Sequence, residues 1–515
     1  MSQITNQSLR KIVKGTAVIF LSSIIGMLFG FGGRVLVARF FSQSEYGVYS
    51  LALIIFLIAA SISTFGLQQS SARQIAYYRG KADAAKVQEV ISSSLQIALI
   101  ASILLSGLLF FTSGVISMQI FDEPGLALPL KIFSIAIPFL VLMKMLASIF
   151  QGFDEVKPRA YFEDILRKGL FPLLLLPVIL LSLSFSAGIY AFSASVILTG
   201  IAFAVYTLKK VPFTLERRSV INPTTKELLL FSLPLLVVAM LGFILHWMDT
   251  LMLGYFKTSE IVGLYNGAVP LAQLILLTLT SMGFIYVPIA SQLYSQNLIG
   301  EMKRTYQVVT KWISSVSLPL FLLLFLFPET ILSFFFGAGY AEAAMALRIL
   351  SLGLVFHTFL GANGMTLLVM GKTTLLMWAS LLAAGLNLIL NIILIPIWGI
   401  TGAATASLIS YFAANIFNST KLFQLSGIHP FTKSYLKPIL ASGGIIAIIY
   451  ALTRSLLVLS YWMLPVIFIL FLVLYGLSLL LTKSFDEEDI MLLLAIEKRV
   501  GVDVGPIKRI LKKFV

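Results

Sequence analysis

Long apolar segments, each close to the length needed to cross a bilayer, are the feature that most constrains the fold of this chain. A membrane helix needs about 20 mainly apolar residues, and the sequence contains fourteen such segments. They lie near residues 15–40, 45–68, 87–118, 126–151, 158–182, 185–208, 226–255, 261–294, 303–327, 342–370, 374–396, 400–424, 434–455 and 461–482. These runs are continuous rather than short and alternating, so they predict an all-α polytopic membrane protein and not a β-barrel.

Composition supports this assignment and excludes several alternatives. Charged residues make up 11 % of the chain, against about 25 % in soluble domains. Cysteine is absent and only three histidines occur, so we expect no disulfide framework and no metal site. The first apolar run is longer than a signal-peptide core, and we interpret it as a retained membrane span.

Lysine and arginine concentrate in alternate loops, which predicts the orientation of the chain. The basic loops include Arg73 to Lys86, Lys157 with Arg159, and Lys209 to Lys226, whereas the loops between them hold almost no basic residues. The positive-inside rule then places both termini in the cytoplasm. The net charge of +15 is therefore explained by topology, and we expect no nucleic-acid partner.

An internal repeat divides the chain. The segment GRVLVARFFSQSEYGVYSLAL near the N-terminus matches LGYFKTSEIVGLYNGAVP, so that Ser44 aligns with Ser259 and Gly47 with Gly263. A duplicated unit with both copies starting inside predicts two parallel six-helix lobes. The predicted domains are the N-lobe at 1–208, a cytoplasmic linker at 209–225, the C-lobe at 226–424, two further spans at 434–482, and a cytoplasmic tail at 483–515. The tail is either an amphipathic segment on the membrane surface or a solvated end.

Ionisable residues inside spans are costly and usually face a protein-lined cavity. Lys144 lies in an otherwise apolar segment, where it could bind a phosphate or could extend toward the cytoplasmic interface near Gln151. Arg34 aligns with Asp249 in the repeat; the two could form a charge pair between the lobes, or Arg34 could pair with Glu45. We predict an anion-binding cleft from Arg34, Lys144, Arg348 and Asn363.

His246 stands one helical turn before Asp249, and this pair could gate transport or carry a proton. A hydrogen bond from His246 to a neighbouring helix is the alternative. We predict no cofactor, with a proton or sodium ion as the candidate coupling ion. The chain lacks the GxxxxGK[ST], G-x-S-x-G and H-E-x-x-H patterns, so we predict no ATP hydrolysis and no enzymatic activity.

The segment NLILNIILIPIWGITGAATAS, from Asn387 to Ser407, predicts a tightly packed helical hairpin of small residues. It resembles the signature of the polysaccharide transporters in the multidrug/oligosaccharidyl-lipid/polysaccharide (MOP) exporter superfamily. The resemblance implies a V-shaped pair of bundles that rock about the linker and pass a polyprenyl-(pyro)phosphate-linked oligosaccharide from the cytoplasmic to the outer leaflet. The two additional spans resemble those of fourteen-helix flippases rather than twelve-helix drug exporters.

The resemblance also implies partners and location. We expect a multi-pass monomer in the cell membrane of a prokaryote, in contact with membrane lipids, a lipid-linked glycan and glycan-assembly enzymes. Two alternatives remain open: a cation-coupled multidrug exporter, for which Asp249 would be needed, and a flippase for a lipid II-type peptidoglycan precursor. A membrane glycosyltransferase is disfavoured because no loop is large enough to hold catalytic residues.

Overall fold

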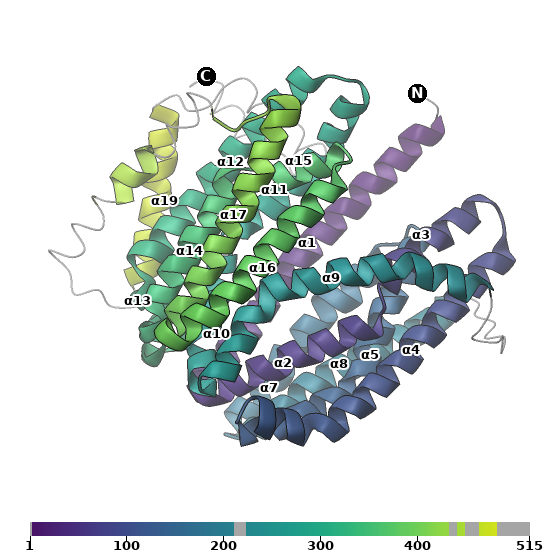
Figure 1. Cartoon of the computed structure of the whole chain (residues 1–515), viewed down its shortest axis with the longest axis horizontal. Helices are drawn as coiled ribbons and strands as arrows, with labels where there is room; N and C mark the ends of the chain where they lie inside the picture. The colour runs from purple at the N-terminus through teal and green to yellow at the C-terminus, as the bar shows by residue number, and fades with distance from the viewer. Residues whose placement is uncertain (1–2, 211–222, 432–439, 447, 449–462, 482–515) are drawn as a thin grey trace. The chain divides into compact units, whose positions relative to one another are not determined.

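The computed structural model describes residues 3–210, 223–431, 440–446, 448 and 463–481, and these are helical with short connections (Figure 1). The chain divides into two compact units, Met1–Gly263 and Leu264–Val515. Helices of the first unit are α1 (Gln3–Phe40), α2 (Gln43–Ser63), α3 (Leu67–Gly80), α4 (Ala84–Val115), η1 (Ile116–Ile120), η2 (Pro124–Leu126), α5 (Ala127–Gly152), α6 (Lys157–Arg159), η3 (Ala160–Leu166), α7 (Arg167–Leu180), α8 (Phe185–Lys210) and α9 (Pro223–Phe256).

Helix α10 (Ser259–Gln273) begins in the first unit and ends in the second. The second unit continues with α11 (Leu276–Ser295), α12 (Ile299–Leu326), α13 (Pro328–Phe336), η4 (Ala338–Ala343), α14 (Ala344–Phe359), α15 (Asn363–Val369), α16 (Thr373–Trp398), α17 (Ile400–Ser426) and α19 (Leu464–Leu481).

The described residues contain ten helical segments that are long and apolar enough to cross a membrane, and two shorter apolar helices at Met240–Phe256 and Val466–Leu481. Ten of the predicted spans correspond to these long segments. The predicted span at 158–182 is helical but charged at its start, and most of 434–455 lies outside the described residues. The all-α polytopic class is therefore confirmed, while the count of fourteen stays a prediction.

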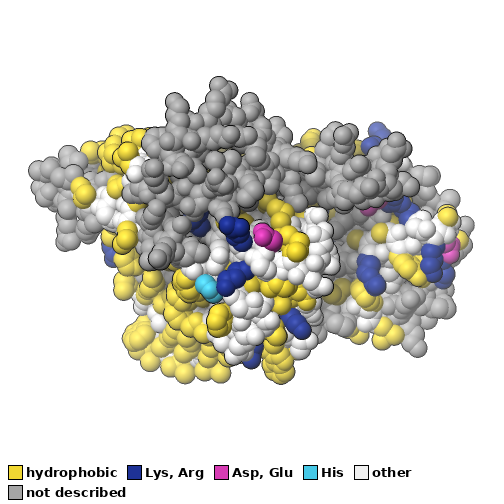
Figure 2. All heavy atoms as spheres, turned by 90° about the horizontal axis from the view of Figure 1, so that it is seen from above, with side chains coloured by type: hydrophobic (Ala, Val, Ile, Leu, Met, Phe, Trp, Pro, Cys, Tyr) yellow, Lys and Arg dark blue, Asp and Glu magenta, His cyan; other side chains and the backbone are white. Residues whose placement is uncertain are grey.

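The outer surface of these helices suits a lipid environment. Figure 2 shows hydrophobic side chains over much of the described surface on one face, interrupted by a group of Lys and Arg side chains. Large apolar side chains such as Phe111, Leu180 and Leu104 are exposed. Outside a membrane this much exposed apolar surface would cause aggregation.

Helix α5 is central to the first unit, where it packs against α2, α3, α4 and α8 (Figure 1). An aromatic cluster fills the contact between these helices. The ring of Phe133 lies 4.7 Å from that of Phe192 and 6.1 Å from that of Tyr49, and Phe171 lies 5.3 Å from Phe192. Offset and edge-to-face pairs of this kind add about 0.5–1.5 kcal/mol each beyond the burial of their area. The cluster fixes α5 and with it the side chains on its C-terminal half.

The aligned segments of the repeat meet where α2 and α10 begin. Ser44 Oγ lies 2.7 Å from Ser259 Oγ. A Cβ on Gly47 would overlap the carbonyl oxygen of Ser259, and a Cβ on Gly263 would overlap that of Gln43. We call this contact the glycine crossing. Residues aligned from the sequence of the two halves therefore lie against each other, and only glycine permits the approach of the two backbones.

The division at Gly263 differs from the predicted lobes, because α9 packs against α2, α3 and α4 of the first unit. Residues 211–222 of the predicted linker and the tail at 483–515 lie outside the described residues, so the domain boundaries stay predictions. The predicted hairpin is confirmed: α16 and α17 pack closely around a turn at Gly399 (φ +55°), and Gly402 lies directly against the Leu394 carbonyl.

Candidate functional site

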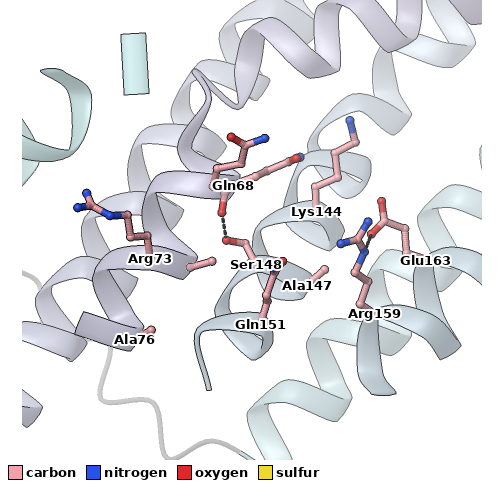
Figure 3. A pocket seen from close by; sticks show the side chains of 11 residues that line it. Gln68, Arg73, Ala76, Lys144, Ala147, Ser148, Gln151, Arg159 and Glu163 are labelled. Atoms are coloured by element: carbon pink, nitrogen blue, oxygen red, sulfur yellow. Dashed lines mark hydrogen bonds and ion pairs between the residues drawn. The ribbon is translucent and has the colours of Figure 1, made fainter. Parts of the chain in front are cut away.

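A polar cavity of about 540 Å³ opens in the first unit between α3, the end of α5 and the segment α6–η3 (Figure 3). The predicted anion-binding residue Lys144 lines it. The other lining residues are Gln68, Gln69, Ala72, Arg73, Ala76, Ala147, Ser148, Gln151, Arg159 and Glu163. Three cations, one carboxylate and three carboxamides thus surround one cavity in an otherwise apolar bundle.

Lys144 lies in the C-terminal half of α5, between the buried residues Met143 and Met145. In the described part of the chain, its ammonium has no hydrogen bond or ion pair. An ammonium that has left bulk water without a partner is unfavourable, and an anion entering the cavity would remove that penalty.

The other charges of the cavity have partners. Arg159 Nε lies 3.5 Å from Glu163 Oε2 across one turn of helix, as the dashed line in Figure 3 marks. The guanidinium of Arg73 lies 4.6 Å from the ring of Phe231, a cation–π contact. Ser148 Oγ donates a hydrogen bond to the carbonyl oxygen of Gln68, which ties α5 to the start of α3.

Another cation without an ion pair lies close to the cavity. Arg167 follows the π-helical segment η3, its Nε is buried without a hydrogen-bond partner, and it lies within electrostatic range of Lys144. The nearest carboxylates are engaged elsewhere: Glu163 with Arg159, and Asp164 with Lys168 at 3.2 Å. Single-turn π segments often mark functional positions. The site therefore has an excess of positive charge, held by Lys144, by Arg167 and by Arg73, whose cation–π contact leaves its charge in place.

Arg34 lies on α1 outside this cavity. Its guanidinium is 5.9 Å from the ring of Trp247 on α9, and Asp249, two residues further along α9, is 7 % exposed. The structure thus brings Arg34 next to the helix that carries Asp249, while a charge pair between them stays a prediction. The alternative partner, Glu45, accepts hydrogen bonds from Ser42 in a capping box at the start of α2. His246 is exposed, with Trp247 as its neighbouring ring.

The two predicted site residues of the second unit are bound to protein groups. Arg348 Nη2 lies 2.9 Å from Glu329 Oε1, and its Nε donates to the carbonyl oxygen of Phe325. Asn363 is buried and donates to Ser419 Oγ at 2.9 Å and to Asn415 Oδ1 at 3.3 Å. Neither lines the cavity around Lys144, and their predicted role in anion binding stays a prediction.

Arg73, Arg159 and Arg167 were not predicted from the sequence as members of the site. Arg73 and Arg159 were assigned to basic loops. For Arg73 the reason is that the second span was ended near residue 68, whereas α3 extends to Gly80. The i,i+4 spacing of Arg159 and Glu163 in the sequence does predict an ion pair. The sequence does not indicate that Arg167 lacks an ion-pair partner, because Glu163 and Asp164 shortly before it suggest that its charge is neutralised locally.

Two relatives resemble most of the chain. An uncharacterized membrane protein of Methanocaldococcus jannaschii, MJ1068, is 26 % identical over 426 residues, which cover 79 % of this chain and 83 % of the relative. The probable low-salt glycan biosynthesis flippase Agl15 of Haloferax volcanii is 25 % identical over 411 residues, covering 78 % and 81 %.

A solved structure of the lipid II flippase MurJ in an inward closed conformation has the same fold. The TM-score is 0.72 at 16 % identity, and the match covers 89 % of this chain and 97 % of MurJ. A family model named MatE matches residues 234–393. The model for polysaccharide biosynthesis proteins matches residues 12–294, more than half of the 515 residues. The chain is therefore a member of the polysaccharide biosynthesis protein family.

Proposed function

We propose that this protein is a flippase that moves a polyprenyl-(pyro)phosphate-linked oligosaccharide from the cytoplasmic to the outer leaflet by alternating access. One observation carries the proposal: Lys144 and Arg167, two cations within the first unit, have no ion-pair partner among the described residues, and Lys144 lines a polar cavity. A phosphate group supplies the missing negative charge. The similarity to a probable glycan biosynthesis flippase supports the same function, and the protein is a transporter rather than an enzyme.

The rest of the cavity suits the glycan. The carboxamides of Gln68, Gln69 and Gln151 can donate and accept hydrogen bonds, as sugar hydroxyl groups require. A prenyl tail needs no polar site, since it can stay in the bilayer. The basic residues around the cavity belong to the predicted cytoplasmic side, so the site is open to substrates made in the cytoplasm. The protein then acts in the cell membrane of a prokaryote with both termini cytoplasmic.

Export of cationic drugs is the second candidate, since the MatE model matches residues 234–393. The charge of the cavity opposes it. Glu163 is the one carboxylate that lines the cavity, and it is paired with Arg159. A cationic drug would therefore meet Lys144, Arg73 and Arg159 without a free carboxylate. A lipid II-type precursor shares the diphosphate chemistry of a lipid-linked oligosaccharide, and only the glycan portion distinguishes the two substrates.

The first test is binding of a short-chain polyprenyl diphosphate to the purified protein in nanodiscs, measured by calorimetry. Lys144→Met keeps the length of the side chain and removes the charge. Loss of one hydrogen bond to a charged group costs about 1.5–3 kcal/mol, which is about 10- to 150-fold in the dissociation constant. Arg167→Met is expected to weaken binding by a similar factor.

Lys86→Met is the matched control, because the Lys86 ammonium is already paired with Glu89 at 3.2 Å on α4, away from the cavity. It should bind as the unsubstituted protein does. In cells, Lys144→Met should abolish glycan export at an unchanged protein level. Normal binding and export in both Lys144→Met and Arg167→Met would refute the proposed function. Efflux of a cationic dye that requires Asp249 would favour drug export instead.

A further inference from the structure

A buried hydrogen-bond network surrounds the break between α14 and α15 in the second unit. Residues 360–362 separate the two helices, and Gly361 there has φ +72°. His357 lies one turn before the break, Asn363 is the first residue of α15, and Asn415 of α17 contacts both. The network contains a titratable group at a discontinuous helix, and the anion site of the first unit does not use it.

The contacts fix the orientation of both carboxamides. The N–H of Gly364 donates to Asn363 Oδ1 at 2.6 Å, so Nδ2 of Asn363 is the group that donates to Asn415 Oδ1 at 3.3 Å. Asn415 Nδ2 then donates to the Tyr411 carbonyl oxygen at 2.7 Å and faces His357 Nδ1 at 2.5 Å. Because Asn415 offers only N–H groups on this side, His357 Nδ1 must accept. The imidazole is therefore neutral, with its proton on Nε2.

A proton on Nδ1 is incompatible with this arrangement, since two donors would then face each other. Reversal of the Asn415 carboxamide would offer Oδ1 to His357, but it would also turn Nδ2 toward Nδ2 of Asn363 and lose the bond to the Tyr411 carbonyl oxygen. Asn363 would then have to give up its bond to Asn415 or to Gly364. Protonation of His357 is thus transmitted through two carboxamides to the first turn of α15.

We infer that His357 is the proton-binding site that couples the proton gradient to transport, by switching the hydrogen bonds of Asn415 and Asn363 at the α14–α15 break. This inference rests on the proposed transport function. It differs from the sequence prediction, which placed proton handling at His246 and Asp249. His246 is exposed, and its ring neighbour is Trp247, whereas His357 controls a discontinuity in a membrane helix.

Several titratable groups lie on the helices that pack around the break. On α17, the ring of Tyr411 lies 5.9 Å from that of His357. On α12, the Tyr306 hydroxyl donates to the Leu360 carbonyl oxygen within the break, and Lys311 is buried. Further groups are Tyr286 on α11, bonded to Thr366, Glu329 on α13, paired with Arg348, and Tyr340 and Glu342 on η4. In the described chain, no carboxylate is bonded to His357, so Asn415 is its controlling partner.

The presence of only three histidines makes a direct test practical. His246→Gln combined with His429→Gln leaves His357 as the single imidazole, whose ring nitrogens can be followed by ¹⁵N NMR in nanodiscs between pH 5 and 8. We expect Nδ1 to change from acceptor to protonated nitrogen in this range. Hydrogen exchange at residues 360–366 should rise by about tenfold at the lower pH, in the usual range for coupling between two sites.

His357→Gln is the decisive variant, because a glutamine oxygen can still accept from Asn415 but cannot take up a proton. This variant should fold and keep slow hydrogen exchange at residues 360–366 at both the higher and the lower pH. The inference would be overturned if His357 stayed neutral down to pH 5. It would also be overturned if His357 became protonated without a change in hydrogen exchange at residues 360–366. A pH gradient should accelerate flipping in liposomes, and an equal response in His357→Gln would also overturn it. If no glycan is flipped at all, the proposed function fails, while the NMR and exchange results still decide the role of His357.

Discussion

The glycine crossing allows a prediction whose size can be worked out from the structure. Gly47→Ala would place a methyl group against the carbonyl oxygen of Ser259, far inside an ordinary carbon–oxygen contact of about 3.5 Å. Neither partner is a flexible side chain, so α2 and α10 must move apart. Overpacking of this kind costs about 1–3 kcal/mol. The hydrogen bond between Ser44 and Ser259, at 2.7 Å, would be lost as well, at about 0.5–1.5 kcal/mol.

The expected loss of stability is therefore about 2–4 kcal/mol. For a domain of 150–250 residues, 1 kcal/mol corresponds to about 2–4 °C in Tm, so Gly47→Ala should lower the Tm of the purified protein by roughly 4–16 °C. Tm can be measured by the fluorescence of a thermally unfolding sample in detergent. Gly263→Ala, which would overlap the carbonyl oxygen of Gln43, should have the same effect.

Gly107→Ala is the matched control. Gly107 lies on α4, and a Cβ there would have no neighbour within 4 Å. Alanine is favoured over glycine in a helix by about 0.5–1 kcal/mol, so this variant should be as stable as the parent or slightly more stable. Equal Tm values for Gly47→Ala and Gly107→Ala would refute the close approach of the two backbones.

Three further predictions concern individual charges and glycines. Glu163→Gln removes the carboxylate of the cavity and releases Arg159, so calorimetry should show severalfold tighter binding of a polyprenyl diphosphate; weaker binding would contradict the anion site. Arg348→Gln breaks a half-exposed ion pair with Glu329, and such pairs contribute about 0–1 kcal/mol, so Tm should change little; a large loss would show a stronger structural role. Gly361→Ala should lower Tm more than Gly371→Ala, since both have φ +72° but only at Gly361 would a Cβ overlap Thr310.

The sequence was most informative where one strong physical constraint acts alone. Continuous apolar runs require helices in a membrane, and the small residues around Gly402 require close packing, so the helical class and the α16–α17 hairpin could be predicted. Lys144 could be singled out because a lone charge in an apolar run has few explanations. The structure places it on a polar cavity, although its role in binding remains to be tested.

Prediction was limited where several charges lie close together in sequence. The order Glu163, Asp164, Arg167 and Lys168 suggests neighbouring pairs that neutralise each other. The pair of Asp164 with Lys168 forms, but Glu163 of the π-helical segment η3 pairs with Arg159, and Arg167 is left without an ion pair among the described residues. The sequence gives no signal for a change from i→i+4 to i→i+5 hydrogen bonding. Nor could the alignment of Arg34 with Asp249 show that Trp247 lies beside Arg34.

The glycine crossing also has the geometry of an isologous interface, in which residue i of one partner meets residue j of the other and the reverse contact is repeated. Gly47 meets the carbonyl of Ser259, Gly263 meets that of Gln43, which is one residue before the position aligned with Ser259, and Ser44 faces its own counterpart, so the reciprocity holds to within one residue. Two separate copies of a single half could form this contact as a twofold homodimer. Fusion into one chain would then raise the effective concentration of the partners and leave each half free to specialise, one with the cationic cavity and the other with the half-buried His357.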